Sequence, residues 1–422
     1  MRYFYTVLLY LALPFIFIRL FWRSRQISDY RRRLGERLGF YPIQFEKCIW
    51  VHAVSVGEVL AAIPLIKALQ VRYAELPLLV TTMTPTGAAR VTSAFGKNVT
   101  HAYLPYDLPG SVNRFLKTMH PTVGLIMETE LWPNLLAACY HQHIPVGLLN
   151  ARLSEKSAKK YHRIAVITRN MLQSLSVIAA HGHVDAKRFI ALGASQHTVV
   201  VTGNIKFDLQ LPNNLFAESM KLRESFGQNR FIWIAASTHE GEEEQILQVH
   251  QQLQQKNQQA LLILVPRHPD RFDTIFKLSE QYGFKTSRRS QQSTAMSDTA
   301  VYLGDTMGEL LLMYAASDVA FVGGSLIPRG GHNMLEPGAL GKPILMGKHL
   351  FNFAEISELF IEARALSIVS SAELLLQLIR LMNDIKERTQ MGERARQVVE
   401  ANRGALNKQL ELITKMMQSS VV

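Results

Sequence analysis

Residues 318–347 read DVAFVGGSLIPRGGHNMLEPGALGKPILMG, and this stretch decides the fold. Two short apolar runs, at 318–324 and 343–347, flank a glycine-rich turn and a segment in which a helix can begin at Asn333. Continuous apolar runs are typical of strands that are covered on both faces, as in parallel sheets. A strand, a helix and a second strand in this order predict part of a doubly wound α/β domain.

The same alternation continues along most of the chain. The earlier apolar runs are CIWVHA, PLLVTTM, VGLIMETE, PVGLLN, SVIAAHG, TVVVTGN, FIWIAAS, ALLILV and AVYLG. The more polar segment 208–228 divides these runs into two sets, residues 286–299 are expected to form an exposed loop, and the end of the chain should be helical. The sequence therefore predicts two Rossmann-like domains, at 23–207 and 208–422, with ligands bound outside the carboxyl ends of the strands in an interdomain cleft.

The N-terminus is a separate apolar segment. Residues from Tyr3 to Trp22 carry one charge, Arg19, and about 20 such residues span a hydrocarbon core. The arginine-rich stretch RSRQISDYRRRLGER that follows places its end in the cytoplasm. A cleaved signal peptide is the alternative, but its charge should precede the apolar run and a small-residue cleavage site should follow it. We expect a single-pass transmembrane anchor at 1–22 with both domains on the cytoplasmic side.

Composition narrows the class of partner. The 422 residues carry a formal net charge of +12, which favours acidic partners such as nucleic acid, anionic lipid or phosphorylated substrates. The arginine cluster is confined to the stretch beside the apolar segment, where anionic head groups attract it, so we expect no nucleic-acid partner. Cys48 and Cys139 are too few for a disulfide framework, which fits a reducing compartment.

Carboxylates follow two of the predicted strands in the first domain. In HAVSVGEVLAAIP, Glu58 lies in the first turn of a helix, where it is held as an anion and can accept a proton from an attacking hydroxyl. The alternative is a purely structural capping box, since Ser55 lies three residues before it. In METELWP, Glu128 and Glu130 point the same way from a strand end, and Glu128 is either used in catalysis or paired with helix N–H groups or an arginine.

Two loops of the second domain carry polar groups of the kind that bind a nucleotide. After ALLILV come Pro266, Arg267 and His268, and the last two can contact a donor phosphate or base, or are simply solvated. After AVYLG, Asp305 or Thr306 is expected to cap a helix that starts at Met307 or Gly308, with Glu309 in its first turn. THEGEEE at 238–244 is better explained by a helix capped at Thr238 than by a metal site.

The glycine-rich turn in the opening stretch is the densest candidate. Gly323 and Gly324 suggest backbone N–H groups wrapped around a phosphate, and Asn333 and Glu336 fall on one side of the following helix. A glutamate in this place can hold two ribose hydroxyls. A glycine-rich turn without a ligand is the alternative.

These residues together resemble a known family, the 3-deoxy-D-manno-octulosonic acid (Kdo) transferases of lipid A assembly. The resemblance runs from the N-terminal segment to about residue 360 and is carried by HAVSVGE, TTMTPTG, LPYDLPG, METELWPN, NARLS, STHEGEE, ILVPRHP, GDTMGEL, FVGGS and GGHNMLEP in this order. It implies a GT-B fold, CMP-Kdo as donor and a lipid A precursor (tetraacyldisaccharide 1,4'-bisphosphate, lipid IVA) as acceptor. It also implies an early step of lipopolysaccharide core assembly at the cytoplasmic face of the inner membrane.

The resemblance also implies roles for individual residues. Glu58 matches the family's proposed general base, and Glu128 matches a glutamate that supports catalysis. Lys206 and Arg267 are candidates to stabilise the departing phosphate without a metal or other cofactor, in a single displacement that inverts the anomeric centre. The nucleotide-binding positions are Pro266, Arg267, Met307, Gly308, Glu309, Asn333, Met334, Leu335 and Glu336.

Two other functions stay open from the residues alone. One is another membrane-associated GT-B enzyme that uses a UDP-sugar, such as a lipid A disaccharide synthase or a nucleotide-sugar epimerase. The other is a membrane protein that binds a nucleotide without turnover, although anion binding alone does not need carboxylates at strand ends.

Overall fold

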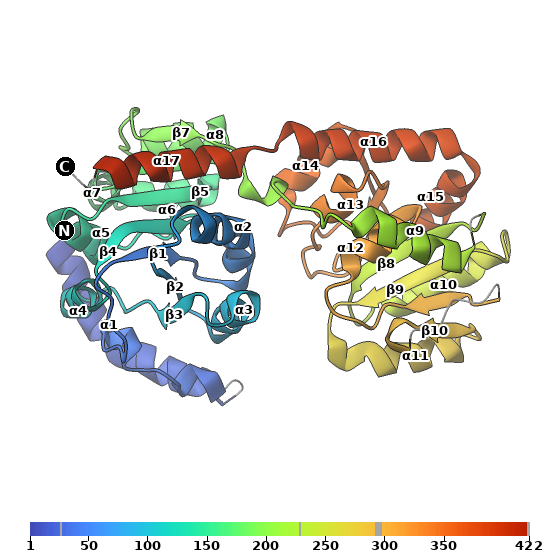
Figure 1. The fold of residues 1–422 in the computed structure, drawn as a ribbon, viewed down its shortest axis with the longest axis horizontal. Helices are drawn as coiled ribbons and strands as arrows, with labels where there is room; N and C mark the ends of the chain where they lie inside the picture. The colour runs from blue at the N-terminus through green and yellow to red at the C-terminus, as the bar shows by residue number, and fades with distance from the viewer. Residues whose placement is uncertain (26–27, 228, 292–297, 420–422) are drawn as a thin grey trace. The chain divides into compact units, whose positions relative to one another are not determined.

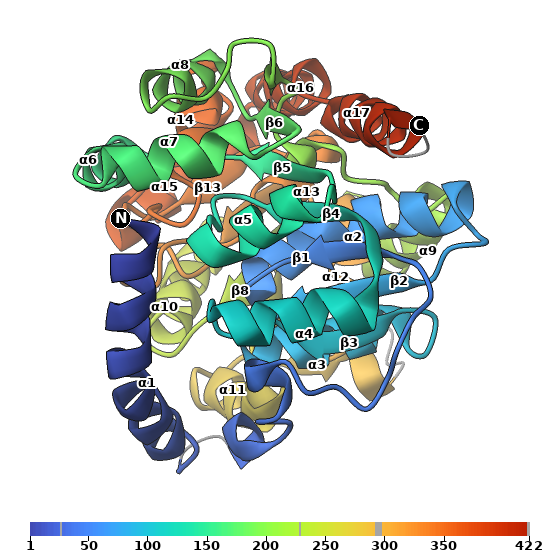
Figure 2. The same cartoon turned by 90° about the vertical axis from the view of Figure 1, so that its left-hand side faces the viewer.

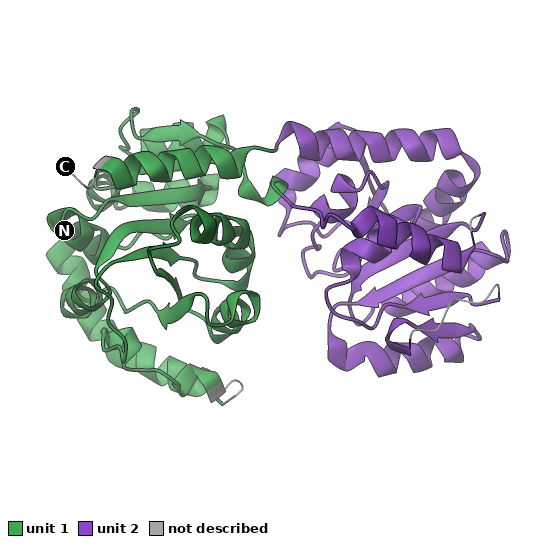
Figure 3. Ribbon diagram, in the orientation of Figure 1, with its two compact units in different colours: residues 1–208, 403–422 green, residues 209–402 purple. Residues whose placement is uncertain are grey.

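The computed structural model describes residues 1–422 apart from 26–27, 228, 292–297 and 420–422, and it divides the chain into two units. Unit 1 contains Met1–Asp208 and Arg403–Val422, and unit 2 contains Leu209–Asn402 (Figure 3). Helices and parallel strands alternate in both (Figure 1). The expected α/β class with two doubly wound units is therefore confirmed.

Unit 1 is built on a seven-stranded parallel sheet in the order β3-β2-β1-β4-β5-β6-β7. Side chains of one strand enter cores on opposite faces, since Trp50 belongs to one buried cluster and its neighbours Ile49 and Val51 to the other. Burial on both faces explains why the strands are continuously apolar. The strands are β1 (Cys48–His52), β2 (Leu78–Thr82), β3 (Thr100–Tyr103), β4 (Pro121–Met127), β5 (Val146–Ala151), β6 (Val177–Ala180) and β7 (Val199–Val201).

Helices cover both faces of this sheet. One face carries α4, α5, α7 and α8, and Figure 2 looks onto α4, α5 and α7; the opposite core receives side chains of α2, α3 and α17. The unit-1 helices are α1 (Arg2–Arg23), α2 (Val56–Arg72), α3 (Pro85–Phe95), α4 (Pro109–Met119), α5 (Pro133–His141), α6 (Glu155–His162), α7 (Ala165–Gln173), α8 (His183–Ala191) and α17 (Ala405–Ser419), with short 3₁₀ turns η1 (Ser28–Arg31), η2 (Glu36–Leu38) and η3 (Ile205–Phe207).

The last helix returns to unit 1, although the sequence analysis placed residues 208–422 in the second domain. Ile413 of α17 is fully buried in the unit-1 core. The turn before α17 is held by Asp208, whose carboxylate accepts the N–H groups of Gly404 at 2.6 Å and Leu406 at 2.7 Å. A return of this kind depends on contacts between distant residues, so local sequence pattern does not reveal it.

Unit 2 repeats the architecture with a second seven-stranded parallel sheet, in the order β10-β11-β9-β8-β12-β13-β14. Its strands are β8 (Ile232–Thr238), β9 (Leu261–Pro266), β10 (Thr286–Arg288), β11 (Val301–Leu303), β12 (Val319–Val322), β13 (Ile344–Met346) and β14 (Leu366–Ile368). Its helices are α9 (Leu215–Phe226), α10 (Glu243–Gln254), α11 (Phe272–Gln281), α12 (Leu310–Ala316), α13 (Leu335–Ala339), α14 (Ala354–Glu362), α15 (Ser371–Asn383) and α16 (Ile385–Ala401), with 3₁₀ turns η4 (Pro269–Arg271) and η5 (Arg289–Gln291).

Three strands were not expected from the sequence, and each is an edge strand. These are β3, β10 and β14, which end the two sheets. Edge strands are less covered than central ones, so their residues are less apolar, as THAY in β3 and TSR in β10 illustrate. Strand β10 begins the segment 286–299 that was expected to be a loop, and residues 292–297 of that segment lie outside the described residues.

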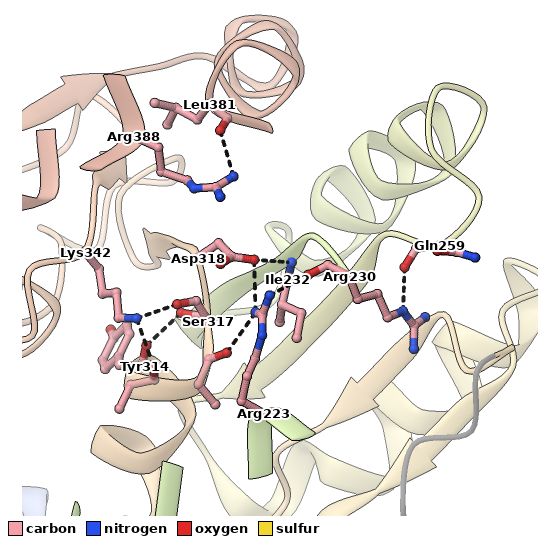
Figure 4. Close-up of polar contacts among 12 residues, drawn as sticks. Arg223, Arg230, Ile232, Gln259, Tyr314, Ser317, Asp318, Lys342, Leu381 and Arg388 are labelled. Carbon is pink, nitrogen blue, oxygen red and sulfur yellow. Dashed lines mark hydrogen bonds and ion pairs between the residues drawn. The ribbon is translucent and has the colours of Figure 1, made fainter. Parts of the chain in front are cut away.

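A polar network ties together the amino-terminal ends of the unit-2 strands (Figure 4). Asp318, just before β12, accepts the N–H of Ile232 at 2.8 Å and pairs with Arg223 at 3.0 Å. Lys342, just before β13, donates to the carbonyl of Ser317 at 2.6 Å, and burial lowers its pKa to about 8. Ligands bind at the opposite, carboxyl ends of such sheets, so we assign this network a structural role.

The apolar helix α1 lies along unit 1. By length and composition it can cross a membrane, and none of its residues is buried. Tyr5 is hydrogen-bonded to Asp107, Thr6 donates to Asn134 at 3.2 Å, and Phe17 meets Tyr106 edge-on with ring centroids 6.0 Å apart. These contacts extend over most of the helix and leave its other face exposed.

Candidate functional site

Glu58 occupies the first turn of α2, directly after β1. Ser55 is the N-cap of this helix, and its hydroxyl accepts the N–H of Glu58 at 3.4 Å. The Glu58 carboxylate accepts the N–H of Val54 at 2.8 Å and the hydroxyl of Ser55 at 2.9 Å. The Ser55 half of the capping box that the sequence suggested is therefore present, but the Glu58 carboxylate returns to the N–H of Val54, one residue before the N-cap, and not to that of Ser55. Burial raises the pKa of Glu58, and the hydrogen bonds from Val54 and Ser55 oppose that rise.

Glu128 follows β4 in an uncommon backbone conformation. Its φ of +57° lies in the left-handed region, which costs a residue with a side chain roughly 1–2 kcal/mol. Its N–H donates to the carbonyl of Leu149 at 2.9 Å, which fixes the backbone. Its carboxylate lies 3.4 Å from Nζ of Lys206, which η3 presents after β7. Backbone strain that the surrounding structure maintains often marks a functional position.

Glu130 completes a group of three carboxylates with Glu58 and Glu128. Burial, followed by repulsion from the Glu58 charge and then the Glu128 charge, raises the pKa of Glu130 to about 7. Strands β1 and β4 are neighbours, so the residues that follow them meet at one edge of the sheet. The structure thus brings together carboxylates from two motifs that are 70 residues apart in the sequence.

In unit 2, three imidazoles and several arginines gather at the carboxyl ends of β8 and β9. Nε2 of His239 lies 2.7 Å from Nε2 of His332, with the rings nearly parallel at 12°. His268 meets His239 edge-on at 5.3 Å. Burial, with the nearby Arg267 charge, lowers the pKa of His332 to about 4, so this ring is neutral near pH 7. Neutral rings beside a permanent cation form a surface suited to an anion or a base.

His239 was not among the site residues predicted from the sequence. THEGEEE was interpreted as a helix capped at Thr238 in preference to a metal site, whereas α10 begins at Glu243 with Glu242 as its N-cap. Thr238 instead donates its hydroxyl to Glu243 at 3.1 Å. Among the described residues, no group of three or more His, Cys, Asp or Glu side chains could hold a metal ion.

The glycine-rich turn after β12 already holds an anion from the protein itself. The carboxylate of Glu242 accepts the N–H groups of Gly324 at 2.7 Å, Ser325 at 3.0 Å and Leu326 at 2.9 Å. The sequence analysis expected these N–H groups to face a phosphate, and in the structure a buried carboxylate occupies that place. Gly323 is needed for a different reason, since a Cβ there would lie 2.6 Å from the carbonyl oxygen of Ser237.

Asn333 and Glu336 do lie together, as expected. The amide of Asn333 donates to Glu336 at 3.1 Å, and its oxygen accepts the N–H of Leu335 at 3.1 Å. Helix α13 begins at Leu335, two residues later than predicted. Met334 and Leu335 are buried, so only their backbone is placed to meet a ligand. Burial raises the pKa of Glu336.

The loop after β11 differs from its expected form. Helix α12 begins at Leu310 with Glu309 as its N-cap, later than the predicted start at Met307 or Gly308. Glu309 receives two hydrogen bonds from Arg289, at 2.6 and 3.0 Å, and these bonds lower its pKa. Met307 is exposed, and Gly308 has a φ of +87°. A nucleotide role for these three residues stays a prediction.

The chain is similar to proteins of one family along its whole length. The family model described as 3-deoxy-D-manno-octulosonic-acid transferase (kdotransferase) matches residues 32–209. The chain is 43% identical to the 3-deoxy-D-manno-octulosonic acid transferase of Haemophilus influenzae, over 100% of both chains. It is 35% identical to that of Bordetella pertussis, over 97% of this chain and 98% of the other.

A solved structure shares the fold. UDP-GlcNAc 2-epimerase from Neisseria meningitidis, bound to UDP-GlcNAc, superposes with a TM-score of 0.57 over 87% of this chain and 100% of that one, at 16% identity. A likeness at this identity shows the GT-B-like fold and says nothing of the donor. The full-length identity to named transferases decides the family: the chain belongs to the 3-deoxy-D-manno-octulosonic acid transferases and is a glycosyltransferase.

Proposed function

We propose that this transferase moves Kdo from CMP-Kdo onto a lipid A precursor, tetraacyldisaccharide 1,4'-bisphosphate (lipid IVA), at the cytoplasmic face of the inner membrane. The observation that carries the proposal is the group of three carboxylates at the carboxyl edge of the unit-1 sheet, in a chain of this family. A sugar hydroxyl must lose a proton as it attacks, and a carboxylate with a raised pKa is suited to accept it.

Glu58 is the general base in this proposal, even though it caps α2. A carboxylate has about four lone pairs on its two oxygens, and the contacts with Val54 and Ser55 use only some of them. The remaining lone pairs can accept the proton of the acceptor hydroxyl. That oxygen attacks the anomeric carbon of Kdo, the bond to the CMP phosphate breaks, and the anomeric configuration inverts.

The nucleotide is held by unit 2 in this proposal. Arg267 and His268 follow β9 and contact the phosphate and base, while Asn333 and Glu336 contact the ribose hydroxyls. Arg267 stabilises the departing phosphate, a contribution typically worth about 10²–10³-fold in rate for one donor. Lys206 supports the negative charge from unit 1, where it is paired with Glu128.

Membrane attachment belongs to α1 in this proposal. The sequence favours a single pass with both domains in the cytoplasm, and this stays a prediction. The contacts of Tyr5, Thr6 and Phe17 with unit 1 support a second arrangement, in which α1 lies in the membrane plane with its exposed face in lipid. This second arrangement keeps those contacts and the carboxylates on the cytoplasmic side, whereas a single pass requires α1 to leave unit 1.

A transfer assay followed by mass spectrometry tests the reaction. The protein in detergent receives the lipid acceptor and CMP-Kdo, which is made in place because the donor is labile. We expect the lipid to gain the mass of one or more Kdo groups with wild-type protein and with Glu75→Ala, an exposed control on unit 1. Glu58→Ala should bind the donor and give no product. Transfer from a UDP-sugar, with none from CMP-Kdo, would overturn the proposal.

A further inference from the structure

A cavity of about 510 Å³ lies in unit 1 beside the three carboxylates. Three segments form its wall: the start of α1, the turn that follows β4, and the helices α6 and α7. Its lining is mostly apolar and includes Phe4, Leu8, Trp132, Ile164, Ile167 and Met171. This volume falls within the range of about 300–1,000 Å³ that small-molecule sites occupy.

The cavity lining also includes polar groups. Thr129 and Glu130 contribute to it, and Glu130 belongs to the carboxylate group described above. With its pKa near 7, Glu130 is protonated in a large share of molecules at neutral pH and can then donate a hydrogen bond. A molecule that fills the cavity thus has hydrocarbon along most of its length and a polar group at the proposed catalytic residues.

Residues of α1 that line the cavity also reach the exposed surface of this helix. Phe4 and Leu8 line the cavity, and they are also 67% and 49% exposed. The same helix is apolar enough to enter a membrane. Hydrocarbon can therefore pass from lipid into the cavity without crossing water.

We propose that this cavity binds one acyl chain of the lipid acceptor, with the acceptor sugar held at Glu130. The inference rests on the proposed function, since it assigns the acceptor's chain to a place beside the proposed base. At roughly 30 Å³ for each methylene, close to the share of one water in the liquid, a cavity of about 510 Å³ takes about 17 carbons. Seating the chain there would fix the sugar relative to Glu58 and would make an acylated acceptor a better substrate than the same sugar without chains.

A variant that fills the cavity tests the inference. Ile167 of α7 lines the cavity, whereas its neighbour Val166 is 57% exposed and lies outside it. Ile167→Trp thus adds a tryptophan side chain inside the cavity, and Val166→Trp adds the same side chain outside it. For each protein, kcat/KM is measured with the tetraacyl acceptor and with the same disaccharide bisphosphate without chains. We expect Ile167→Trp to lower the ratio of kcat/KM for the tetraacyl acceptor to kcat/KM for the chain-free acceptor at least tenfold. Val166→Trp should leave this ratio at the wild-type value.

A wild-type ratio in Ile167→Trp, with normal transfer, would overturn the inference and leave the proposed function standing. If no transfer is found, a binding measurement still tests the cavity inference separately from the proposed function. Trp132 lines the cavity, Trp50 and Trp233 are fully buried, and Trp22 is exposed on α1. In Trp22→Phe protein, a fatty acid with a dibrominated chain should quench fluorescence saturably. Quenching no greater than in Trp22→Phe/Trp132→Phe would overturn the inference whatever the protein transfers.

Discussion

Glu128 and Lys206 meet at 3.4 Å, joining the residue that follows β4 to the turn that follows β7. Their side chains are 28% and 29% exposed, and ion pairs open to solvent typically contribute about 0–1 kcal/mol to stability. The left-handed backbone of Glu128 costs at least as much. Because stability does not account for this arrangement, we interpret the pair as part of the reaction site.

The first prediction concerns this pair. Glu128→Gln should lower kcat strongly while changing the free energy of unfolding by less than about 1 kcal/mol, since it removes the charge of a pair that solvent still reaches. Transfer rates and urea unfolding measure the two effects. The matched control is Glu155→Gln, which breaks an exposed 2.6 Å pair with Lys159 and should leave transfer unchanged. A stable Glu128→Gln protein with wild-type turnover would show that the pair is structural.

The second prediction separates the two roles of Glu58. A glutamine side chain keeps an oxygen that can accept the N–H of Val54, and Ser55 still caps the helix, so Glu58→Gln should keep α2 and its stability. It cannot accept a proton, and loss of a general base typically costs about 10²–10⁴-fold in rate. Kinetics with saturating donor and thermal unfolding of the same sample measure both.

Helix α15 provides a matched control for Glu58→Gln. Ser370 and Glu373 form a full capping box there, in which the carboxylate accepts the N–H of the N-cap residue itself, and both residues belong to unit 2. Glu373→Gln should therefore change neither transfer nor unfolding appreciably. If Glu58→Gln keeps its rate within a factor of two or so, Glu58 is only a capping residue and the base lies elsewhere.

The third prediction concerns pH and Glu130. Burial and the neighbouring carboxylates raise its pKa to about 7 in the folded protein, from the ordinary glutamate value of 4.5. The folded chain therefore holds more protons than the unfolded chain between these values, so this group's stabilisation is full below pH 4.5 and is lost as pH rises through about 7. Glu130→Gln removes that loss.

The measurement is the free energy of unfolding of wild type and Glu130→Gln at several pH values. The free energy of unfolding of the variant, relative to that of the wild type, should rise between pH 5 and pH 8 by at most on the order of 3 kcal/mol. Glu75→Gln, at an exposed position, should follow the wild type throughout. Parallel curves for Glu130→Gln and wild type would mean that Glu130 titrates normally.

The central fold could be predicted from the sequence for a physical reason. Strands such as β1, β4, β8 and β9 are buried on both faces, so each is a continuous apolar run that stands out from its surroundings. The edge strands β3 and β10 lack that pattern. The return of α17 to unit 1 rests on contacts of Asp208 with Gly404 and Leu406, nearly 200 residues away, and no local rule reports such contacts.

The candidate site, like the fold, contains contacts that could be predicted from the sequence and contacts that could not. The contact between Ser55 and Glu58 could be predicted because these residues lie three positions apart. The contact between Asn333 and Glu336 was predicted from helical spacing, and it is present although Asn333 lies before α13. The occupation of the glycine-rich turn by Glu242 could not be predicted, because its partner Gly324 lies 82 residues away and the same turn is equally suited to a phosphate.

The fourth prediction decides how α1 meets the membrane. Tyr3 is 80% exposed near its start, and the native Cys48 and Cys139 are fully buried, so an introduced thiol can be labelled selectively. We expect Tyr3→Cys in intact spheroplasts to resist a membrane-impermeant maleimide, because α1 lies along unit 1. Phe40→Cys, exposed elsewhere on unit 1, should react only after lysis. Labelling of Tyr3→Cys before lysis would establish a single pass with an external N-terminus.

The fifth prediction concerns Glu242 and the turn that it fills. Its carboxylate is fully buried and accepts N–H groups from Gly324, Ser325 and Leu326. Glu242→Gly should leave these donors buried and unpaired, and each such group costs about 1–3 kcal/mol. The variant should therefore unfold several kcal/mol more easily than the wild type, as measured by urea unfolding.

An anion should restore what Glu242→Gly removes. The three N–H groups still converge on the vacated space, and converging backbone N–H groups bind anions. Acetate supplies the same carboxylate, so we expect it to raise the unfolding midpoint of the variant saturably, with chloride at equal ionic strength as the reference salt. The wild type should respond to both salts alike, because its own carboxylate occupies the turn. A variant that acetate stabilises no more than chloride does would mean that the turn collapses without Glu242, and that its shape depends on that side chain.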